Sequence, residues 1–269
     1  MSRIKETFTK LGESERAALI PCLVAGDPDL ETTIDAALEL AENGADILEL
    51  VVPFSDPMAD GPTIQAASQR ALSGGVNLKA ILEAVQELTG KINLPLILMT
   101  YLNPPLRMGL AEFARRSKEA GVDGVILPEL PVEEATPWRQ IAEEAGLDTV
   151  FLASPTSGPE RLSEICEAST GFVYAVTLTG TTGARDSLPE ELIQNLQTLK
   201  GMTQKPVAAG FGISGPGTVR RLAPYADGLI VGSALVKLME QGSKEEKIRR
   251  IGEAVKELKA AIEETARRV

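Results

Sequence analysis

The feature that most constrains this chain is an alternation, repeated along its whole length, of short apolar runs rich in β-branched residues with longer segments of helical periodicity. Such alternation is typical of parallel strands joined by helices. The predicted strands span residues 19–24, 46–52, 95–101, 124–127, 149–153, 172–177, 206–210 and 228–231. Because eight strands of this kind close into a barrel, we expect an α/β fold of the (β/α)8 TIM-barrel type.

Three of the predicted helices end in the same way, with a glycine two residues before an aspartate that leads into a strand. These glycines are Gly44, Gly121 and Gly146. The echo falls at strands two, four and five, and no linker interrupts the chain, so one domain over residues 1–269 explains it better than two domains. We expect additional N-terminal and C-terminal helices. The apolar stripe within residues 243–269 favours a closing helix packed on the barrel over a coiled coil.

Composition excludes several classes of function. The chain contains no histidine, so acid–base chemistry falls to carboxylates, Lys, Tyr or Cys. The net charge of −11 disfavours binding to nucleic acid or to an anionic membrane. The N-terminal residues are charged and no apolar run is long enough to span a membrane, so we expect a cytoplasmic protein. Cys22 and Cys166 each lie in an apolar run, which favours buried free thiols over a disulfide or a metal site.

Glu49 is the most unusual residue of the predicted strands. It interrupts an apolar run and shares a face with Ile47 and Val51. Burial of an ionised carboxylate is costly, so such a group tends to keep a proton near neutral pH, as a general acid requires. The alternative is a structural carboxylate paired with a basic residue of a neighbouring strand. Since no predicted strand has a basic residue near its carboxyl end, where a barrel places its active site, catalysis is the favoured interpretation.

The loop that follows this strand carries two more carboxylates. Residues 53–65 contain three prolines together with Asp56 and Asp60. Prolines restrict the backbone and help to hold a carboxylate over a pocket. Asp60 also precedes Gly61-Pro62, where it suits the cap of the next helix equally well, and Asp56 suits a simple turn. From spacing alone, the role of Asp60 stays open.

Glycines after the last strands indicate phosphate binding. Gly210 and Gly212 follow the seventh strand, Gly232 and Ser233 begin a helix after the eighth, and Thr182-Gly183 lies in the loop after the sixth. Backbone N–H groups at these places form the phosphate site of many such barrels. The alternative is ordinary strand-to-helix turns, which the occurrence of two such turns at the expected pair of strands disfavours.

One stretch resembles a known family. Leu48-Glu-Leu-Val-Val-Pro-Phe-Ser-Asp-Pro-Met-Ala-Asp-Gly-Pro-Thr-Ile-Gln65 closely resembles the signature of tryptophan synthase alpha subunits. Shorter matches are Gly26-Asp-Pro28, Leu130-Pro-Val-Glu-Glu134, Gly210-Phe-Gly-Ile-Ser214 and Gly232-Ser-Ala-Leu-Val-Lys237. The resemblance implies a carbon–carbon lyase of tryptophan biosynthesis. Its reaction is the retro-aldol cleavage of indole-3-glycerol phosphate to indole and glyceraldehyde 3-phosphate.

Residue roles follow from this resemblance. Glu49 matches the acid–base residue that protonates indole C3 and takes the glycerol hydroxyl proton, and Asp60 matches the carboxylate that stabilises charge at the indole N–H. The residues that match the indole pocket are Cys22, Ile64, Ile126, Leu152, Tyr174, Phe211 and Ile230. Those that match the phosphate site are Gly183, Gly212, Gly232 and Ser233, and Thr182 matches a lid threonine that meets Asp60 when the site closes.

The resemblance also implies a partner. Alpha subunits of this family dock on a beta subunit that carries pyridoxal phosphate, in an alpha2-beta2 heterotetramer, and indole passes to it through a tunnel. Asp56 and Pro57 match the loop at that contact. By this resemblance, the chain itself requires no cofactor and no metal.

Two alternatives to this function stay open. The first is another phosphate-binding aldolase or isomerase. A Schiff-base mechanism needs a lysine at a strand end, and none is predicted there, whereas metal-assisted cleavage through Glu49, Asp56 and Asp60 is compatible with clustered carboxylates. The second alternative is a chain that acts mainly as an allosteric activator of the beta partner, which the presence of both Glu49 and Asp60 disfavours.

Overall fold

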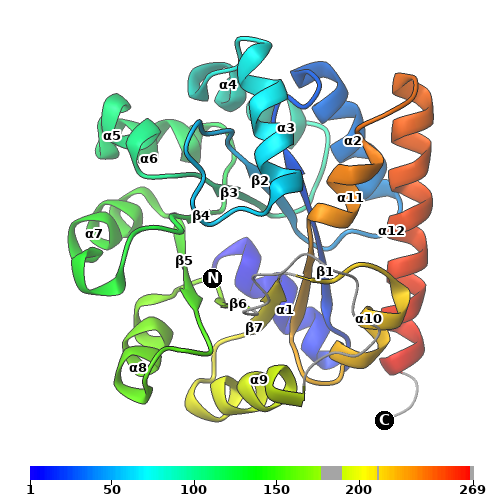
Figure 1. Ribbon diagram of the computed structural model, residues 1–269. Coiled ribbons are helices and arrows are strands. Elements are labelled where there is room, and N and C mark those ends of the chain that lie inside the picture. Colours follow the sequence, from blue (N-terminus) through cyan, green and yellow to red (C-terminus); the bar gives the residue numbers. More distant parts are fainter. Residues whose placement is uncertain (177–189, 211, 267–269) are drawn as a thin grey trace.

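The chain folds as a closed barrel of eight parallel strands in sequence order, in which β1 pairs with both β2 and β8. The computed structural model describes residues 1–176, 190–210 and 212–266. The helices surround the barrel as an outer ring (Figure 1). This is the predicted (β/α)8 TIM barrel.

Every predicted strand is present, with bounds that differ from the prediction by at most two residues. The strands are β1 (Ala18–Val24), β2 (Leu48–Val51), β3 (Leu96–Met99), β4 (Gly124–Ile126), β5 (Asp148–Ala153), β6 (Val173–Val176), β7 (Val207–Gly210) and β8 (Gly228–Val231). They are buried on both faces, which explains why they appear in the sequence as continuous apolar runs.

The helices alternate with the strands as the periodicity predicted. They are α1 (Arg3–Glu13), α2 (Leu30–Glu42), α3 (Pro62–Ser73), α4 (Leu78–Thr89), α5 (Asn103–Met108), α6 (Leu110–Glu119), α7 (Thr136–Ala145), α8 (Pro159–Ala168), α9 (Glu190–Met202), α10 (Pro216–Leu222), α11 (Ser233–Leu238) and α12 (Lys244–Ala266), with a 3-10 helix η1 (Val132–Glu134). None of these described helices is long and apolar enough to cross a membrane.

The N-terminal helix α1 closes the amino-terminal end of the barrel. It buries Ile4, Phe8 and Leu11 in the cluster formed by the inward-facing strand residues. Gly124 and Gly228, which begin β4 and β8, make room for it, since a Cβ atom on either would meet Ile4 or Phe8 at 2.9 or 3.2 Å. A site in this barrel is therefore expected at the opposite, carboxyl end.

The C-terminal helix α12 packs on the barrel as predicted. It contacts α2, α10, α11 and β1, and it runs along one side of the molecule (Figure 1). Lys259 of this helix pairs with Asp46 at 3.0 Å, and both side chains are largely buried, at 16% and 11% exposed.

The glycine–aspartate echo has a structural reason. Gly44, Gly121 and Gly146 follow their helices with φ values of 108°, 90° and 71°, a region that favours glycine. Two of the aspartates then bridge to the preceding strand: Asp46 accepts the backbone N–H of Leu19 at 2.8 Å, and Asp123 accepts that of Leu96 at 3.0 Å. The third, Asp148, differs because its Oδ2 is buried without a hydrogen-bond partner among the described residues.

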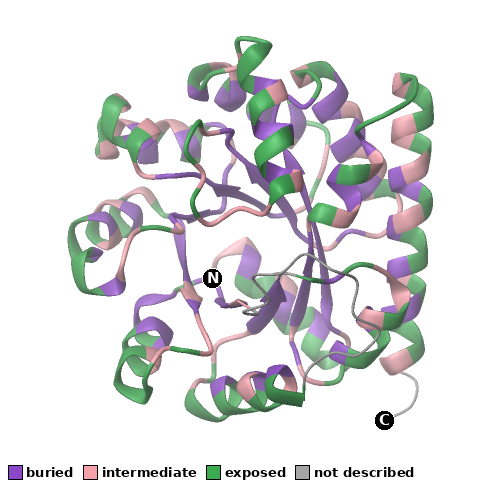
Figure 2. Cartoon of the chain, viewed as in Figure 1, coloured by how far each residue is buried: buried purple, intermediate pink, exposed green. Residues whose placement is uncertain are grey.

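The two faces of each strand belong to different apolar clusters. On β2, Leu48 and Leu50 join the cluster between the barrel and the helices, whereas Val51 and Ile47, which directly precedes the strand, join the cluster inside the barrel. The strands and the inner faces of the helices are buried, and exposed residues lie on the outside (Figure 2). Because side chains alternate along a strand, Glu49 faces the barrel interior, as predicted.

Candidate active site

Glu49 is a buried carboxylate inside the barrel with no basic partner among the described residues. It lies on β2 between Cys22 of β1 and Ile97 of β3 and is only 2% exposed. Its Oε2 is buried without a hydrogen-bond partner among the described residues. The alternative of a structural carboxylate held by a basic side chain therefore finds no support.

Burial raises the pKa of Glu49 to about 7. The hydrogen bond that the Cys22 thiol donates to the carboxylate lowers this pKa, and the negative charge of Asp60 raises it. Near neutral pH the carboxyl is accordingly present both with and without its proton. A group in this condition serves as acid and as base in one reaction cycle.

Asp60 lies at the end of the loop between β2 and α3. Helix α3 has Gly61 as its N-cap, with no side-chain cap, so Asp60 is not the cap residue and the open question of its role is answered in part. Its Oδ2 is buried without a hydrogen-bond partner in the described part of the chain. Burial raises the pKa of Asp60 to about 6, against the lowering effect of a hydrogen bond with Tyr101, and Glu129 adds a smaller upward shift.

Tyr101 is a site residue that the sequence analysis did not identify. It follows β3 and is 3% exposed. Its hydroxyl accepts the backbone N–H of Ala59 at 2.9 Å, and its ring stacks on Phe54 with a centroid separation of 5.0 Å. Since it also bonds the Asp60 side chain, it fastens the loop to the barrel. The sequence signal that could have identified Tyr101 is a polar aromatic residue at the carboxyl end of a predicted strand.

The side chains matched to an indole pocket come together around these carboxylates. Cys22, Ile64, Ile126, Tyr174 and Ile230 belong to the apolar cluster inside the barrel, and Leu152 packs against it. Phe211 lies outside the described residues. We call this apolar cluster around Glu49 the chamber, and the charge of Asp60 acts on Glu49 within it.

Gly210 is required by packing inside the barrel, whatever its part in phosphate binding. A Cβ atom at this position would lie 2.4 Å from the hydroxyl oxygen of Tyr174. The absence of a side chain on β7 thus makes room for the Tyr174 ring on β6. Packing inside the barrel accounts for this glycine without a phosphate.

The other glycines of the predicted phosphate site lie beyond the ends of β7 and β8. Gly212 has a φ of 76°, and Gly232 is the N-cap of α11, which Ser233 begins. A Cβ atom on Gly232 would lie 3.6 Å from the Cβ of Cys22, so this turn borders the apolar chamber. Thr182 and Gly183 lie outside the described residues.

The positions of the lysines and acidic residues test the two alternative mechanisms, which need a Schiff-base lysine or a bound metal. Lys205, which precedes β7, donates to the carbonyls of Cys166 and Glu167 at 2.7 and 2.8 Å, so it does not face the chamber. No lysine is among the buried residues of the described chain. The described acidic residues and cysteines form no group of three that could hold a metal ion. Both cysteines are buried and free, as predicted.

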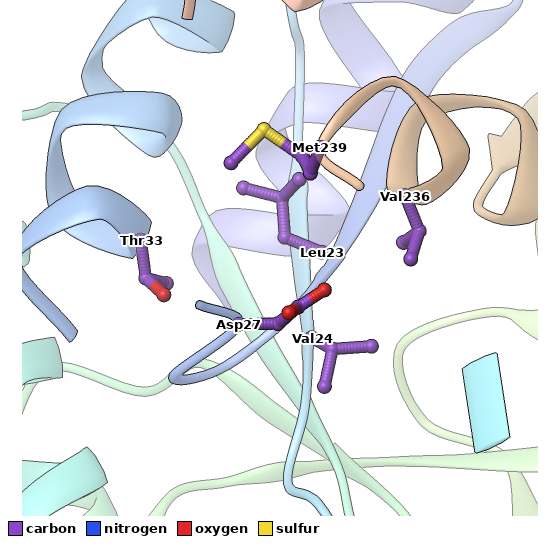
Figure 3. A pocket seen from close by; sticks show the side chains of 6 residues that line it. All are labelled: Leu23, Val24, Asp27, Thr33, Val236 and Met239. Atoms are coloured by element: carbon purple, nitrogen blue, oxygen red, sulfur yellow. The ribbon is translucent and has the colours of Figure 1, made fainter. Parts of the chain in front are cut away.

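A narrow pocket lies beside the chamber, between β1, α2 and α11. Its walls are Leu23, Val24, Asp27, Thr33, Val236 and Met239 (Figure 3). Asp27 bonds Arg70 of α3 at 2.7 and 2.8 Å, which fixes α3 against the end of β1. Because neither Glu49 nor Asp60 lines this pocket, it is a packing feature and not the candidate site.

Comparison with known proteins agrees with this geometry. A family profile described as "Tryptophan synthase alpha chain" matches residues 8–263. The chain is 46% identical over 262 residues to a tryptophan synthase alpha chain of Geotalea daltonii, covering 97% of this chain and 99% of that one. A crystal structure of tryptophan synthase subunit alpha from Legionella pneumophila superposes with a TM-score of 0.91 at 36% identity, covering 98% of this chain and 99% of that chain.

A second solved structure extends the comparison. Tryptophan synthase from M. tuberculosis, in an aminoacrylate-bound form, gives a TM-score of 0.88 at 38% identity and covers 97% of this chain and all (100%) of that chain. Sequence and fold therefore lead to one assignment: the chain belongs to the tryptophan synthase alpha chain family.

Proposed function

We propose that this chain cleaves indole-3-glycerol phosphate to indole and glyceraldehyde 3-phosphate, with Glu49 as the acid–base residue and Asp60 as the stabilising carboxylate. One observation carries the proposal. The carboxyl groups of Glu49 and Asp60 have no ionic partner among the described residues, and burial raises their pKa values to about 7 and about 6. Environments that separate the pKa values of two acids assign them different roles.

Glu49 alone can give and take back the protons that the reaction moves. Its carboxyl group donates a proton to indole C3, and the resulting carboxylate takes the proton of the glycerol hydroxyl. The bond between C3 and the side chain then breaks, its electron pair returns to the indole ring, and the hydroxyl carbon becomes the aldehyde. Glu49 ends the cycle protonated, so it needs no external acid.

The lower pKa of Asp60 suits its part. At pH 7 a group with a pKa of about 6 is mostly ionised, so it carries the negative charge that attracts the indole N–H. Protonation of C3 places positive charge on the ring nitrogen, and a fixed carboxylate in an apolar site stabilises that charge strongly. Tyr101 supports this role because it holds the loop that carries Asp60.

Substrate contacts extend the proposal to both ends of the ligand. The indole ring occupies the space among Cys22, Ile64, Ile126, Leu152, Tyr174 and Ile230, together with Phe211. The phosphate binds the backbone of Gly212, Gly232 and Ser233, together with Gly183, and Thr182 closes over the site. Support comes from the apolar character of the first set and from the position of Gly232 against Cys22.

We further propose a beta subunit as partner, in an alpha2-beta2 assembly, with pyridoxal phosphate held by that subunit. Asp56 and Pro57 belong to the docking loop, and Met58 beside them is 89% exposed, so it offers an apolar side chain for a partner to cover. Leu106 of α5, which is 51% exposed, lies at the same end of the barrel. A cytoplasmic location and one domain over residues 1–269 are part of this proposal.

The alternative functions are less well supported. An aldolase with a Schiff base needs an inward-facing lysine, which the described residues do not offer. An activator without catalysis of its own has no need for two carboxylates kept in an apolar chamber.

The decisive experiment is an assay of the purified chain on indole-3-glycerol phosphate, with and without a beta subunit of the family and with a chelator present. We expect indole and glyceraldehyde 3-phosphate in equal amounts from the lone chain, a higher rate in the complex, and no effect of the chelator. Release of indole only in the complex would favour the activator. Loss of activity with the chelator would favour metal-assisted cleavage.

A further inference from the structure

Cys22 occupies an unusual position next to the acid–base residue. It is the β1 residue in register with Glu49 of β2, and both side chains face the interior of the barrel. Cys22 is 4% exposed and Glu49 2% exposed. On its other side, the Cys22 Sγ lies 3.7 Å from the position of a Cβ on Gly232, so the turn between β8 and α11 limits the directions in which the thiol can turn.

The surroundings make this thiol a donor and not a nucleophile. Burial raises the pKa of Cys22 well above its ordinary value, and the charges of Glu49 and Asp60 raise it further. The thiol therefore keeps its proton, and a protonated thiol inside an apolar chamber donates to the nearest acceptor. The Glu49 carboxylate, which is the register partner of Cys22 on the adjacent strand, is in position to be that acceptor.

Two other groups act on Glu49 through its charge. Asp60 faces it with a like charge. Tyr174 on β6 also interacts with its charge and stays protonated because burial raises the pKa of its hydroxyl. The Glu49 Oε2 has no hydrogen-bond partner among the described residues, so it is available to the substrate.

We propose that Cys22 is a positioning residue, whose thiol holds the Glu49 carboxylate in one orientation and keeps Oε2 directed into the chamber. This proposal rests on the proposed function for its catalytic consequence, although the contact itself does not depend on it. A hydrogen bond to the charged form favours that form. The thiol thus keeps Glu49 able to lose its proton in a chamber that otherwise favours the neutral acid.

Infrared spectroscopy tests the contact directly, because the chain has only two cysteines. In a Cys166→Ala chain the remaining S–H stretching band belongs to Cys22. We expect this band to move as the pH is raised through about 7, the pKa of Glu49, because the thiol then donates to a charged acceptor. The band is expected to stay fixed in the Cys166→Ala, Glu49→Gln chain. A pH-independent band in the chain that retains Glu49 overturns the proposal.

The catalytic consequence is tested with the pH dependence of kcat/KM. Cys22→Ala removes the donor, so the alkaline fall in kcat/KM should move upward by roughly one pH unit. Cys22→Ser keeps a donor of similar size, so the pH of the alkaline fall should stay close to the native value even where the changed pocket lowers the size of kcat/KM. Cys166→Ala is the matched control, since it removes the other buried thiol, and its profile should be native.

The outcomes separate the two proposals. If Cys22→Ala and Cys166→Ala give the same profile, Cys22 only fills space and the inference is wrong. If the native chain does not cleave indole-3-glycerol phosphate, the proposed function is wrong, whereas the infrared result still decides whether the thiol holds Glu49.

Discussion

The hydroxyl of Tyr101 accepts a hydrogen bond of 2.9 Å from the backbone N–H of Ala59, the residue that precedes Asp60. The same hydroxyl bonds the Asp60 side chain, and the Tyr101 ring stacks on Phe54 at the start of the loop. One side chain at the end of β3 therefore fixes the loop backbone and its carboxylate together. This is the kind of supporting contact that keeps a site residue in place.

Replacement of this hydroxyl should impair the site more than the fold. Tyr101→Phe keeps the ring but leaves the Ala59 N–H and Asp60 without this partner, so we expect kcat/KM to fall about tenfold and stability to fall by about 1 kcal/mol. The acidic limb of the pH profile should move upward, because this bond lowers the pKa of Asp60. Tyr225→Phe, at the amino-terminal end of the barrel, is the control. Equal effects of both changes would count against a role for Tyr101.

The pH dependence of the native chain follows from two groups. Asp60 acts as a carboxylate, so kcat/KM should rise as pH increases through about 6. Glu49 acts first as an acid, so kcat/KM should fall as pH increases through about 7. We expect a bell-shaped profile whose limbs belong to the interacting pair. A profile that is flat from pH 5 to pH 8, measured with steady-state rates, contradicts this assignment.

Glu49→Gln should lose activity and gain stability. Without a titratable proton, kcat should fall by about 100- to 10,000-fold, while a phosphate-bearing substrate analogue should still bind. The folded-state pKa of about 7 lies above the ordinary value of 4.5, so the contribution of Glu49 to native stability is fully present below pH 4.5 and is lost as pH rises through 7. At pH 8 the variant should be more stable by about 3 kcal/mol.

Urea unfolding at several pH values measures this gain. Glu257→Gln, an exposed position on α12, is the matched control and should show no pH-dependent gain. A Glu49→Gln chain that is less stable than the native chain at pH 8 would indicate that the carboxylate has a structural partner.

The sequence predicted the barrel well because its strands are buried on both faces and its helices on one. The strands therefore appear in the sequence as continuous apolar runs, and the helices as apolar residues at helical spacing. Their alternation can be recognised from the sequence alone. The inward direction of Glu49 followed from its parity with Ile47 and Val51. These predictions depend only on the spacing of neighbours along the chain.

Contacts between distant residues were not predictable in the same way. Tyr101 ends an apolar strand, where an aromatic residue suits the core equally well, and only the fold brings it to Ala59. Gly210 looked like a phosphate turn because the bulk of Tyr174 on the adjacent strand is not visible in its local sequence. The role of Asp60 as a cap was open until α3 was found to begin at Gly61 without a side-chain cap.

Asp46 should be important for stability and not for catalysis. It accepts the Leu19 N–H at 2.8 Å and pairs with Arg16 and Lys259 at 2.9 and 3.0 Å, all at the amino-terminal end. Since its removal leaves two largely buried cations without their partner, we expect Asp46→Ala to cost about 3 kcal/mol. Breaking the exposed Lys79–Glu83 pair by Glu83→Ala should cost less than about 0.5 kcal/mol. Similar urea-unfolding midpoints for Asp46→Ala and Glu83→Ala would refute this role of Asp46.

Met58 should contribute to partner binding through its exposed side chain. It follows Pro57 in the proposed docking loop and is 89% exposed, so a partner that covers it would remove an apolar surface from water. Met58→Ser should therefore raise the Kd for the beta subunit about tenfold, which is about 1.4 kcal/mol. Leu72→Ser, at a 36% exposed position on α3, is the control and should leave this Kd unchanged.

Because Met58 precedes Ala59, which Tyr101 holds, contact at Met58 is one residue away from the support of Asp60. In the Met58→Ser chain, stimulation of cleavage should therefore rise with the fraction of the chain that is bound to the beta subunit. At saturating beta subunit it should reach the native level. An unchanged Kd, measured by titration calorimetry on a variant with native Tm, would place the contact elsewhere.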